Sequence, residues 1–145
     1  MSKNKLSLEI LEPKLDSLAR CLNRIESKKP FTLESLERDF DLQDIISVNL
    51  ERSVQLSVDI ASVIISFSQN AAPIQMADAF EVLEKMGWLK PDTRTKMKKA
   101  VGFRNIIVHE YEKVNWEIVF KIATEHLNDF RGYASEVVAK LKTGH

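Results

Sequence analysis

The chain has 145 residues, a length typical of one domain, and 44% of them are hydrophobic, which is enough to bury a core. Its 21 basic and 21 acidic residues leave no net charge, so the chain is not a nucleic-acid binder that relies on overall basicity. The single cysteine, Cys21, excludes an internal disulfide and a cysteine-based zinc cluster, and we expect a buried thiol there.

The chain shows no segment of the kind that enters or crosses a membrane. Its first residues, Met-Ser-Lys-Asn-Lys, are not followed by the long apolar core of a signal peptide. The least polar stretch, residues 60–74, is interrupted by serines, amides and a proline, which excludes a membrane span. We therefore expect a cytoplasmic protein that does not contact a membrane.

The first helix is predicted over residues 14–25, where leucines and an isoleucine recur at helical spacing. Pro13 suits the first turn of this helix, because the N–H that proline lacks has no partner there. Residues 1–12 are expected to form an N-terminal arm or a separate short helix. Residues 13–145 are then one helical domain.

A short helix and a long one follow in chain order. Thr32 and Ser35 favour a capped start for the short helix, which is expected to end near Phe40. The long helix opens at position 41 or 44 and runs to about 68, and from Leu56 onward its apolar residues occur on all sides. That pattern is typical of a central helix. Many of these residues are β-branched, so a buried strand is the alternative, but the length of the segment favours a helix.

The rest of the chain also has helical spacing. One helix is expected to start at Pro73 and to end at Gly87, a typical C-terminal glycine. Pro91 opens the next. Asn115 caps the last helix, which Gly132 weakens in its middle. The expected fold class is all-α, an up-and-down bundle of about five helices with short connections.

Residues 104–111 gather most of the side chains that carry chemistry. They read Arg-Asn-Ile-Ile-Val-His-Glu-Tyr and follow a basic run, residues 90–104, in which only Asp92 has the opposite charge. Arg104 and Tyr111 share a helix face, because seven residues return to within about 20° of the starting direction. Asn105 and His109 are four apart and share a neighbouring strip.

These residue types are suited to phosphate chemistry. Arginine offers a planar, permanently charged fork for phosphate oxygens, and histidine exchanges a proton near neutral pH. RNA carries its own nucleophile, the 2′-hydroxyl, so a base and a cation can cleave it without a metal. However, Arg104 as a solvated ion-pair partner and His109 as a helix cap fit the same pattern, and the residues alone leave both interpretations open.

Residues 102–111, Gly-Phe-Arg-Asn-Ile-Ile-Val-His-Glu-Tyr, resemble the signature of the HEPN superfamily, in which an arginine and a polar residue precede a histidine. The continuation to Tyr111, two residues after His109, is similar to the HepT-like branch. Asn-Leu-Glu-Arg at 49–52 also resembles that branch, and the similarity spans roughly residues 14–141.

The resemblance implies a HEPN-like homodimer that acts as a ribonuclease toxin, with the two motifs facing a shared cleft. It implies metal-independent cleavage of RNA, in which Arg104 neutralises phosphate charge, His109 is a general base or acid, and Asn105 fixes their geometry. It also implies an antitoxin, a minimal nucleotidyltransferase of the MntA type, that attaches AMP to Tyr111. No cofactor and no metal are expected.

Three further residues are possible supporting groups. Arg52 and Asp59 are seven apart and are expected to line one face of the long helix, where the carboxylate either orients Arg104 or His109 or belongs to an unrelated ion pair. Lys99 belongs to the basic run. Doubling this run in a homodimer would create a positive groove on a neutral protein.

Two other functions fit the same sequence. A HEPN-like bundle can bind nucleotide or RNA without cutting it, or serve as the dimerising partner of a nucleotidyltransferase. A purely structural bundle with a fortuitous motif is the third hypothesis. The presence of both Arg104 and His109 argues for the enzyme, since a scaffold does not need the pair.

Overall fold

The computed structural model describes residues 5–68, 75–109 and 114–143, except for the side chains of residues 106–109. Within these ranges the chain is all-helical and has no strand. The seven helices are α1 (Leu8–Glu26), α2 (Leu33–Arg38), α3 (Phe40–Ser68), α4 (Asp78–Lys85), α5 (Pro91–His109), α6 (Trp116–Glu125) and α7 (Leu127–Lys142). The all-α prediction is confirmed, and the segment from Leu56 to Ser68 is helix, not strand.

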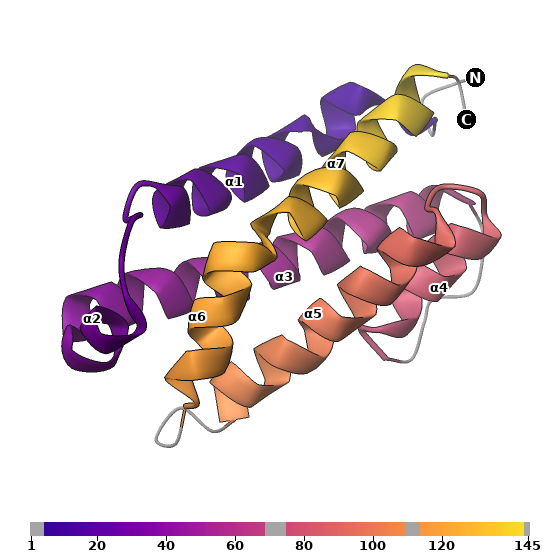
Figure 1. The fold of residues 1–145 in the computed structure, drawn as a ribbon. Helices are drawn as coiled ribbons and strands as arrows, with labels where there is room; N and C mark the ends of the chain where they lie inside the picture. The colour runs from indigo at the N-terminus through magenta and orange to yellow at the C-terminus, as the bar shows by residue number, and fades with distance from the viewer. Residues whose placement is uncertain (1–4, 69–74, 110–113, 144–145) are drawn as a thin grey trace.

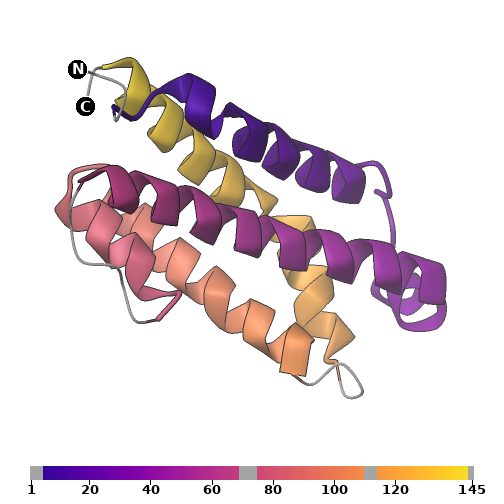
Figure 2. The same ribbon diagram turned by 180° about the vertical axis from the view of Figure 1, so that it is seen from behind.

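Helix α3 is the centre of the bundle and contacts each of the other helices. Helices α1 and α7 lie along one side of it, and α4 and α5 lie along the other (Figures 1 and 2). Ser53 and Ser57 are buried within it without breaking the helix, because each donates its hydroxyl to the carbonyl group four residues earlier. Tyr133 of α7 is fully buried and donates its hydroxyl to the Ser57 carbonyl at 2.8 Å, which ties α7 to α3.

The start of α1 differs from the prediction. The helix begins at Leu8, so Pro13 lies inside it and not in its first turn. An interior proline removes one helical hydrogen bond. However, Leu6 and Leu11 are 4% and 0% exposed, and this burial of the residues before Pro13 offsets the loss. Residues 8–12 therefore continue directly into the helix predicted over 14–25.

The predicted ends can be compared with the structure at the start of α2 and at both ends of α4. Thr32 accepts a hydrogen bond from the Ser35 N–H and Ser35 reciprocates, so the predicted cap of α2 is confirmed. Helix α4 starts at Asp78, later than predicted, and Pro73 lies outside the described residues. Gly87 follows α4 with φ +83°, a conformation that L side chains rarely adopt, and this confirms the predicted C-terminal glycine.

The predicted last helix is two helices, which is one reason the bundle has seven helices and not about five. Asn115 caps α6 by accepting from two backbone N–H groups, as predicted. The break falls at His126, with φ −121° and ψ 9°, and not at Gly132, which lies inside α7 with nothing near its missing Cβ. The break lets α6 pack on α2 while α7 packs on α1 and α5.

No helix in the described part of the chain is long and apolar enough to cross a membrane.

Candidate functional site

The site is built on α5, whose inner face anchors it to the bundle. Met97, Val101 and Phe103 are 0%, 4% and 6% exposed and hold this face in the core. Glu136 of α7 caps the start of the helix, because its carboxylate accepts from the Lys90 N–H at 2.8 Å and from the Thr93 hydroxyl. The buried face and the contacts with Glu136 together fix the position of α5, and the position of Arg104 on this helix follows from them.

Arg104 points from α5 toward α3 and is only 20% exposed. Its Nη2 lies 3.8 Å from Oε1 of Glu51, beyond hydrogen-bond distance. Its Nη1 approaches the sulfur of Met76 at 3.9 Å, and a thioether is a weak acceptor. The guanidinium is thus held by two weak contacts.

The third guanidinium nitrogen of Arg104, Nε, differs from the other two in its surroundings. Nε is buried and has no hydrogen-bond partner in the part of the chain that the structure describes. A buried donor without a partner destabilises a fold by about 1–3 kcal/mol. A phosphate oxygen would satisfy this donor, because Nε and Nη2 form one edge of the fork that binds such groups bidentately.

The remaining motif residues are only partly placed. Asn105 follows Arg104 and is exposed on α5. His109 is the last residue of α5, but its side chain lies outside the described residues. Tyr111 also lies outside them. The predicted sharing of a face by Arg104 and Tyr111 therefore stays a prediction.

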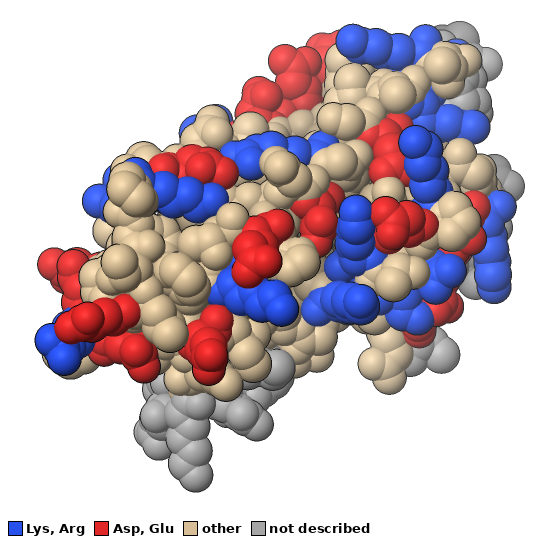
Figure 3. Space-filling view, in the orientation of Figure 1, with Lys and Arg blue, Asp and Glu red and all other residues tan. Residues whose placement is uncertain are grey.

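The basic run before Arg104 is not the positive patch that its sequence predicts. Arg94 pairs with Glu84 at 2.7 Å, Lys98 pairs with Glu81, and Lys96 pairs with Asp92 at 3.0 Å. Asp92 is the only acidic residue within the run, but the acidic residues of α4 pack against α5 and neutralise part of its charge. Figure 3 shows the result, a face on which blue and red side chains alternate. Lys99 is exposed and has no ion pair within the described ranges.

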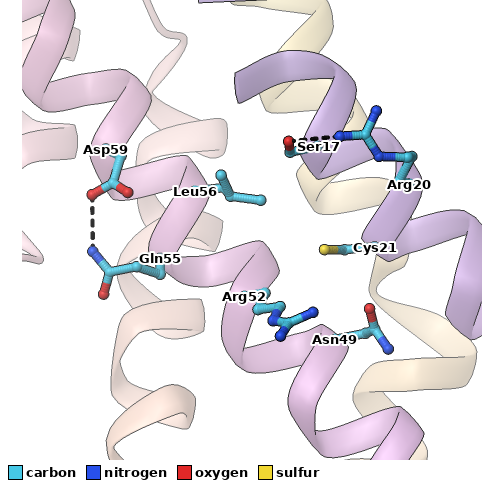
Figure 4. Close-up of a pocket in the computed structure, with 8 residues that line it drawn as sticks. All are labelled: Ser17, Arg20, Cys21, Asn49, Arg52, Gln55, Leu56 and Asp59. Carbon is cyan, nitrogen blue, oxygen red and sulfur yellow. Dashed lines mark hydrogen bonds between the residues drawn. The ribbon is translucent and has the colours of Figure 1, made fainter. Parts of the chain in front are cut away.

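The other two supporting residues lie on a different side of α3. Arg52 and Asp59 both line a pocket of about 460 Å³ between α1 and α3, so the expectation that they share a face is met (Figure 4). Asp59 accepts a hydrogen bond from Gln55 at 2.9 Å. The described contacts of Arg104 are with Glu51 and Met76, and Asp59 is not among them.

Sequence reasoning missed Glu51 and Met76 as neighbours of Arg104. Glu51 directly precedes Arg52, and adjacent residues on a helix differ in direction by about 100°. No sequence signal chooses between the two, because α3 is packed on most sides and either direction meets another helix. Met76 lies between α3 and α4, where no regular periodicity was available to place it.

Within the described residues, no group of three or more His, Cys, Asp or Glu side chains is arranged to hold a metal ion.

Comparison with known families shows which family the chain belongs to. Residues 18–137 match the family described as Ribonuclease HepT-like. The chain belongs to this family. The mRNA nuclease HepT of Shewanella oneidensis is 31% identical over 132 residues, which cover 91% of this chain and 98% of that protein. The tRNA nuclease HepT of Aphanizomenon flos-aquae is 25% identical, with 92% and 91% covered.

A solved structure of a HepT-like relative agrees in fold. The tri-AMPylated HEPN toxin of Shewanella oneidensis, in complex with an MNT antitoxin, superposes on this chain with a TM-score of 0.82. The identity is 32%, and the match covers 90% of this chain and 97% of that one. The helical bundle around α5 is therefore the HEPN fold, and the resemblance inferred from residues 102–111 is confirmed at the level of the family.

Proposed function

We propose that this HepT-like chain is a metal-independent endoribonuclease and the toxin of a toxin–antitoxin pair. The observation that carries the proposal is the buried Nε of Arg104, which has no hydrogen-bond partner among the described residues and lies five residues before His109 in a ribonuclease family. A guanidinium whose Nε–Nη2 edge makes no hydrogen bond to the described residues can donate from that edge to a phosphate group. The named activities of the two HepT relatives, which act on mRNA and tRNA, make RNA the expected source of that phosphate.

The reaction needs only groups of the protein and the RNA. The 2′-hydroxyl oxygen attacks the adjacent phosphorus, and the bond from phosphorus to the 5′-oxygen breaks. His109 accepts the 2′-proton or supplies a proton to the leaving 5′-oxygen, and Arg104 stabilises the charge on the non-bridging oxygens. Asn105 fixes their geometry. The products are a 2′,3′-cyclic phosphate and a 5′-hydroxyl, so no metal or oxidant takes part.

The active form is proposed to be a homodimer with both motifs at one cleft. Large apolar side chains that one bundle leaves exposed support this, with Phe40 at 76% and Val48 at 41% exposed on α3. A two-fold dimer would bury the same side chains on both copies. Light scattering should give about twice the chain mass of 16.6 kDa. A monomer at micromolar concentration would exclude the shared cleft.

The antitoxin is proposed to be a minimal nucleotidyltransferase that works in the cytoplasm on Tyr111. The solved complex of a tri-AMPylated relative with its MNT antitoxin supports this partner. In the proposed step the phenol oxygen of Tyr111 attacks the α-phosphorus of ATP, pyrophosphate leaves, and the phenol proton goes to solvent. The added phosphodiester brings negative charge beside the motif, where it competes with RNA for Arg104.

The direct test incubates the purified protein with total RNA, with and without a chelator. The wild type should cleave RNA equally well in EDTA and leave 2′,3′-cyclic phosphate ends. His109→Ala should be inactive while keeping its helical content and its mass in solution. An active His109→Ala variant, or cleavage lost in EDTA, would leave this protein a binding module or a metal-dependent nuclease.

A further inference from the structure

The pocket between α1 and α3 lies on a different side of α3 from Arg104. Its volume is about 460 Å³, which falls in the range of pockets that hold small ligands. Figure 4 shows that α1 contributes Ser17, Arg20 and Cys21 to the lining, while α3 contributes Asn49, Arg52, Gln55, Leu56 and Asp59. The proposed catalytic residues do not line this pocket, so the nuclease reaction leaves it unexplained.

Two arginines that have no carboxylate partner among the described residues line the pocket. Arg20 donates to the Ser17 hydroxyl at 3.0 Å, and Arg52 makes no ion pair with any described residue. This contrasts with α5, where Arg94, Lys96 and Lys98 each have an acidic partner. Guanidinium groups that line one pocket without a carboxylate partner favour an anionic ligand.

The thiol of Cys21 also lines the pocket, and the charges of both arginines act on it. Burial raises the pKa of Cys21, while the charges of Arg52 and Arg20 act in the opposite direction. Arg20, Arg52 and Cys21 all line the same pocket. The two arginines come from different helices, so this convergence is a property of the fold and not of one run of sequence.

The rest of the lining suits more than a bare inorganic anion. Leu56 and Cys21 supply an apolar floor, and Asn49 adds an amide beside Arg52. Asp59 is an acceptor that Gln55 holds in place at 2.9 Å, and a carboxylate repels phosphate but accepts from ribose hydroxyls or base amino groups. Cationic, apolar and acceptor groups in one pocket match the three parts of a nucleotide.

We propose that this pocket binds a nucleoside phosphate, with the phosphate on Arg20 and Arg52 and the sugar or base toward Leu56 and Asp59. The ligand is either a free nucleotide or one unit of an RNA strand. The RNA form rests on the proposed function, because an RNA strand that crosses α3 would meet Arg52 here and Arg104 on the neighbouring side. The free-nucleotide form does not depend on it.

The test measures binding by the full-length protein with probes that it cannot cleave. Adenosine monophosphate represents the free nucleotide, and a DNA hexamer, which lacks 2′-hydroxyls, represents the strand. Arg20→Gln and Arg52→Gln should each weaken binding about tenfold, as expected for a lost hydrogen bond to a charged group. Both side chains are exposed, so the variants should keep the wild-type circular dichroism spectrum.

Arg24→Gln is the matched control, because Arg24 is exposed on α1 one turn from Arg20 but does not line the pocket. It should bind within about twofold of the wild type. Arg104→Gln should also retain binding of adenosine monophosphate. Binding of the mononucleotide identifies a free nucleotide as ligand, and binding of the hexamer alone identifies a strand.

Three results would overturn the proposal. They are no binding of either probe by the wild type at millimolar concentration, equal effects of Arg24→Gln and Arg52→Gln, and loss of mononucleotide binding in Arg104→Gln alone. None of these depends on cleavage, so the outcome is separate from that of the nuclease assay.

Discussion

Arg104 and Glu51 face each other across the contact between α5 and α3 with 3.8 Å between Nη2 and Oε1. This separation keeps the two charges attracted without a hydrogen bond between them. Glu51 can therefore hold the guanidinium near the helix contact and still release it to a stronger anion. The Nε of the same side chain has no partner among the described residues, so it too can donate to a bound anion.

Glu51→Gln should strengthen RNA binding by a few fold, because the carboxylate competes with phosphate for Arg104 and repels it. The side chain of Glu51 is 41% exposed and the pair is long, so the free energy of unfolding should change by less than about 1 kcal/mol. Binding of a non-cleavable RNA analogue measures the effect. Glu34→Gln, which removes an exposed pair with Arg38, is the control. Weaker binding by Glu51→Gln would mean that the carboxylate positions Arg104 for RNA.

Tyr133→Phe should destabilise the bundle by about 1–2 kcal/mol, because it leaves the buried Ser57 carbonyl without the hydroxyl that α7 donates. Urea unfolding followed by circular dichroism measures this change. Ser66→Ala is the control, since the Ser66 hydroxyl donates only within its own exposed helix turn. Equal midpoints for wild type and Tyr133→Phe would show that this hydrogen bond does not stabilise the contact between α3 and α7.

The α4–α5 contact should weaken in acid through Glu81. The hydrogen bond from Lys98, and then its charge, lower the pKa of Glu81 below its ordinary value. A folded-state pKa below the unfolded one stabilises the protein above the unfolded pKa, and the contribution is lost as pH falls through the folded pKa. From neutral pH to about pH 3 the urea midpoint of Glu81→Gln should therefore fall less than that of the wild type. Glu37→Gln, with no ion pair in the described ranges, should fall as the wild type does.

The sequence predicted the ends of helices correctly where a single residue type determines the end. Thr32, Gly87 and Asn115 set helix ends through a hydrogen bond or a backbone conformation that few residues support. The start of α1 and the break at His126 were not predictable in this way, because both follow from which side chains the assembled core buries.

The same contrast between local sequence signals and tertiary packing holds for the candidate site. The motif predicts a role for Arg104 from the sequence alone, but its neighbour Glu51 comes from another helix and depends on the packing of α3 against α5. The acidic partners of the basic run are on α4, and nothing in the run itself indicates them. Tertiary contacts of this kind decide whether a charged side chain is available to a ligand.

Tyr111→Phe should escape the antitoxin and still cleave RNA, because the substitution removes only the oxygen that accepts AMP. After incubation with the nucleotidyltransferase and ATP, intact-mass spectrometry of the wild type should show added adenylyl groups, and the variant should show none. A variant that is neutralised without any added mass would show that the antitoxin inhibits by binding. Modification of the variant at another residue would remove Tyr111 from the proposed mechanism.

The fork of Arg104 is tested most directly by comparing the rates at which wild type and Arg104→Lys cleave a fluorescent RNA. Lysine keeps the positive charge but has no Nε–Nη2 edge, so single-turnover cleavage should fall about 100-fold or more. Arg94→Lys, which can keep its pair with Glu84, should cleave at the wild-type rate. Wild-type cleavage by Arg104→Lys would contradict the role of the unpartnered Nε, and so would an equal loss in both variants.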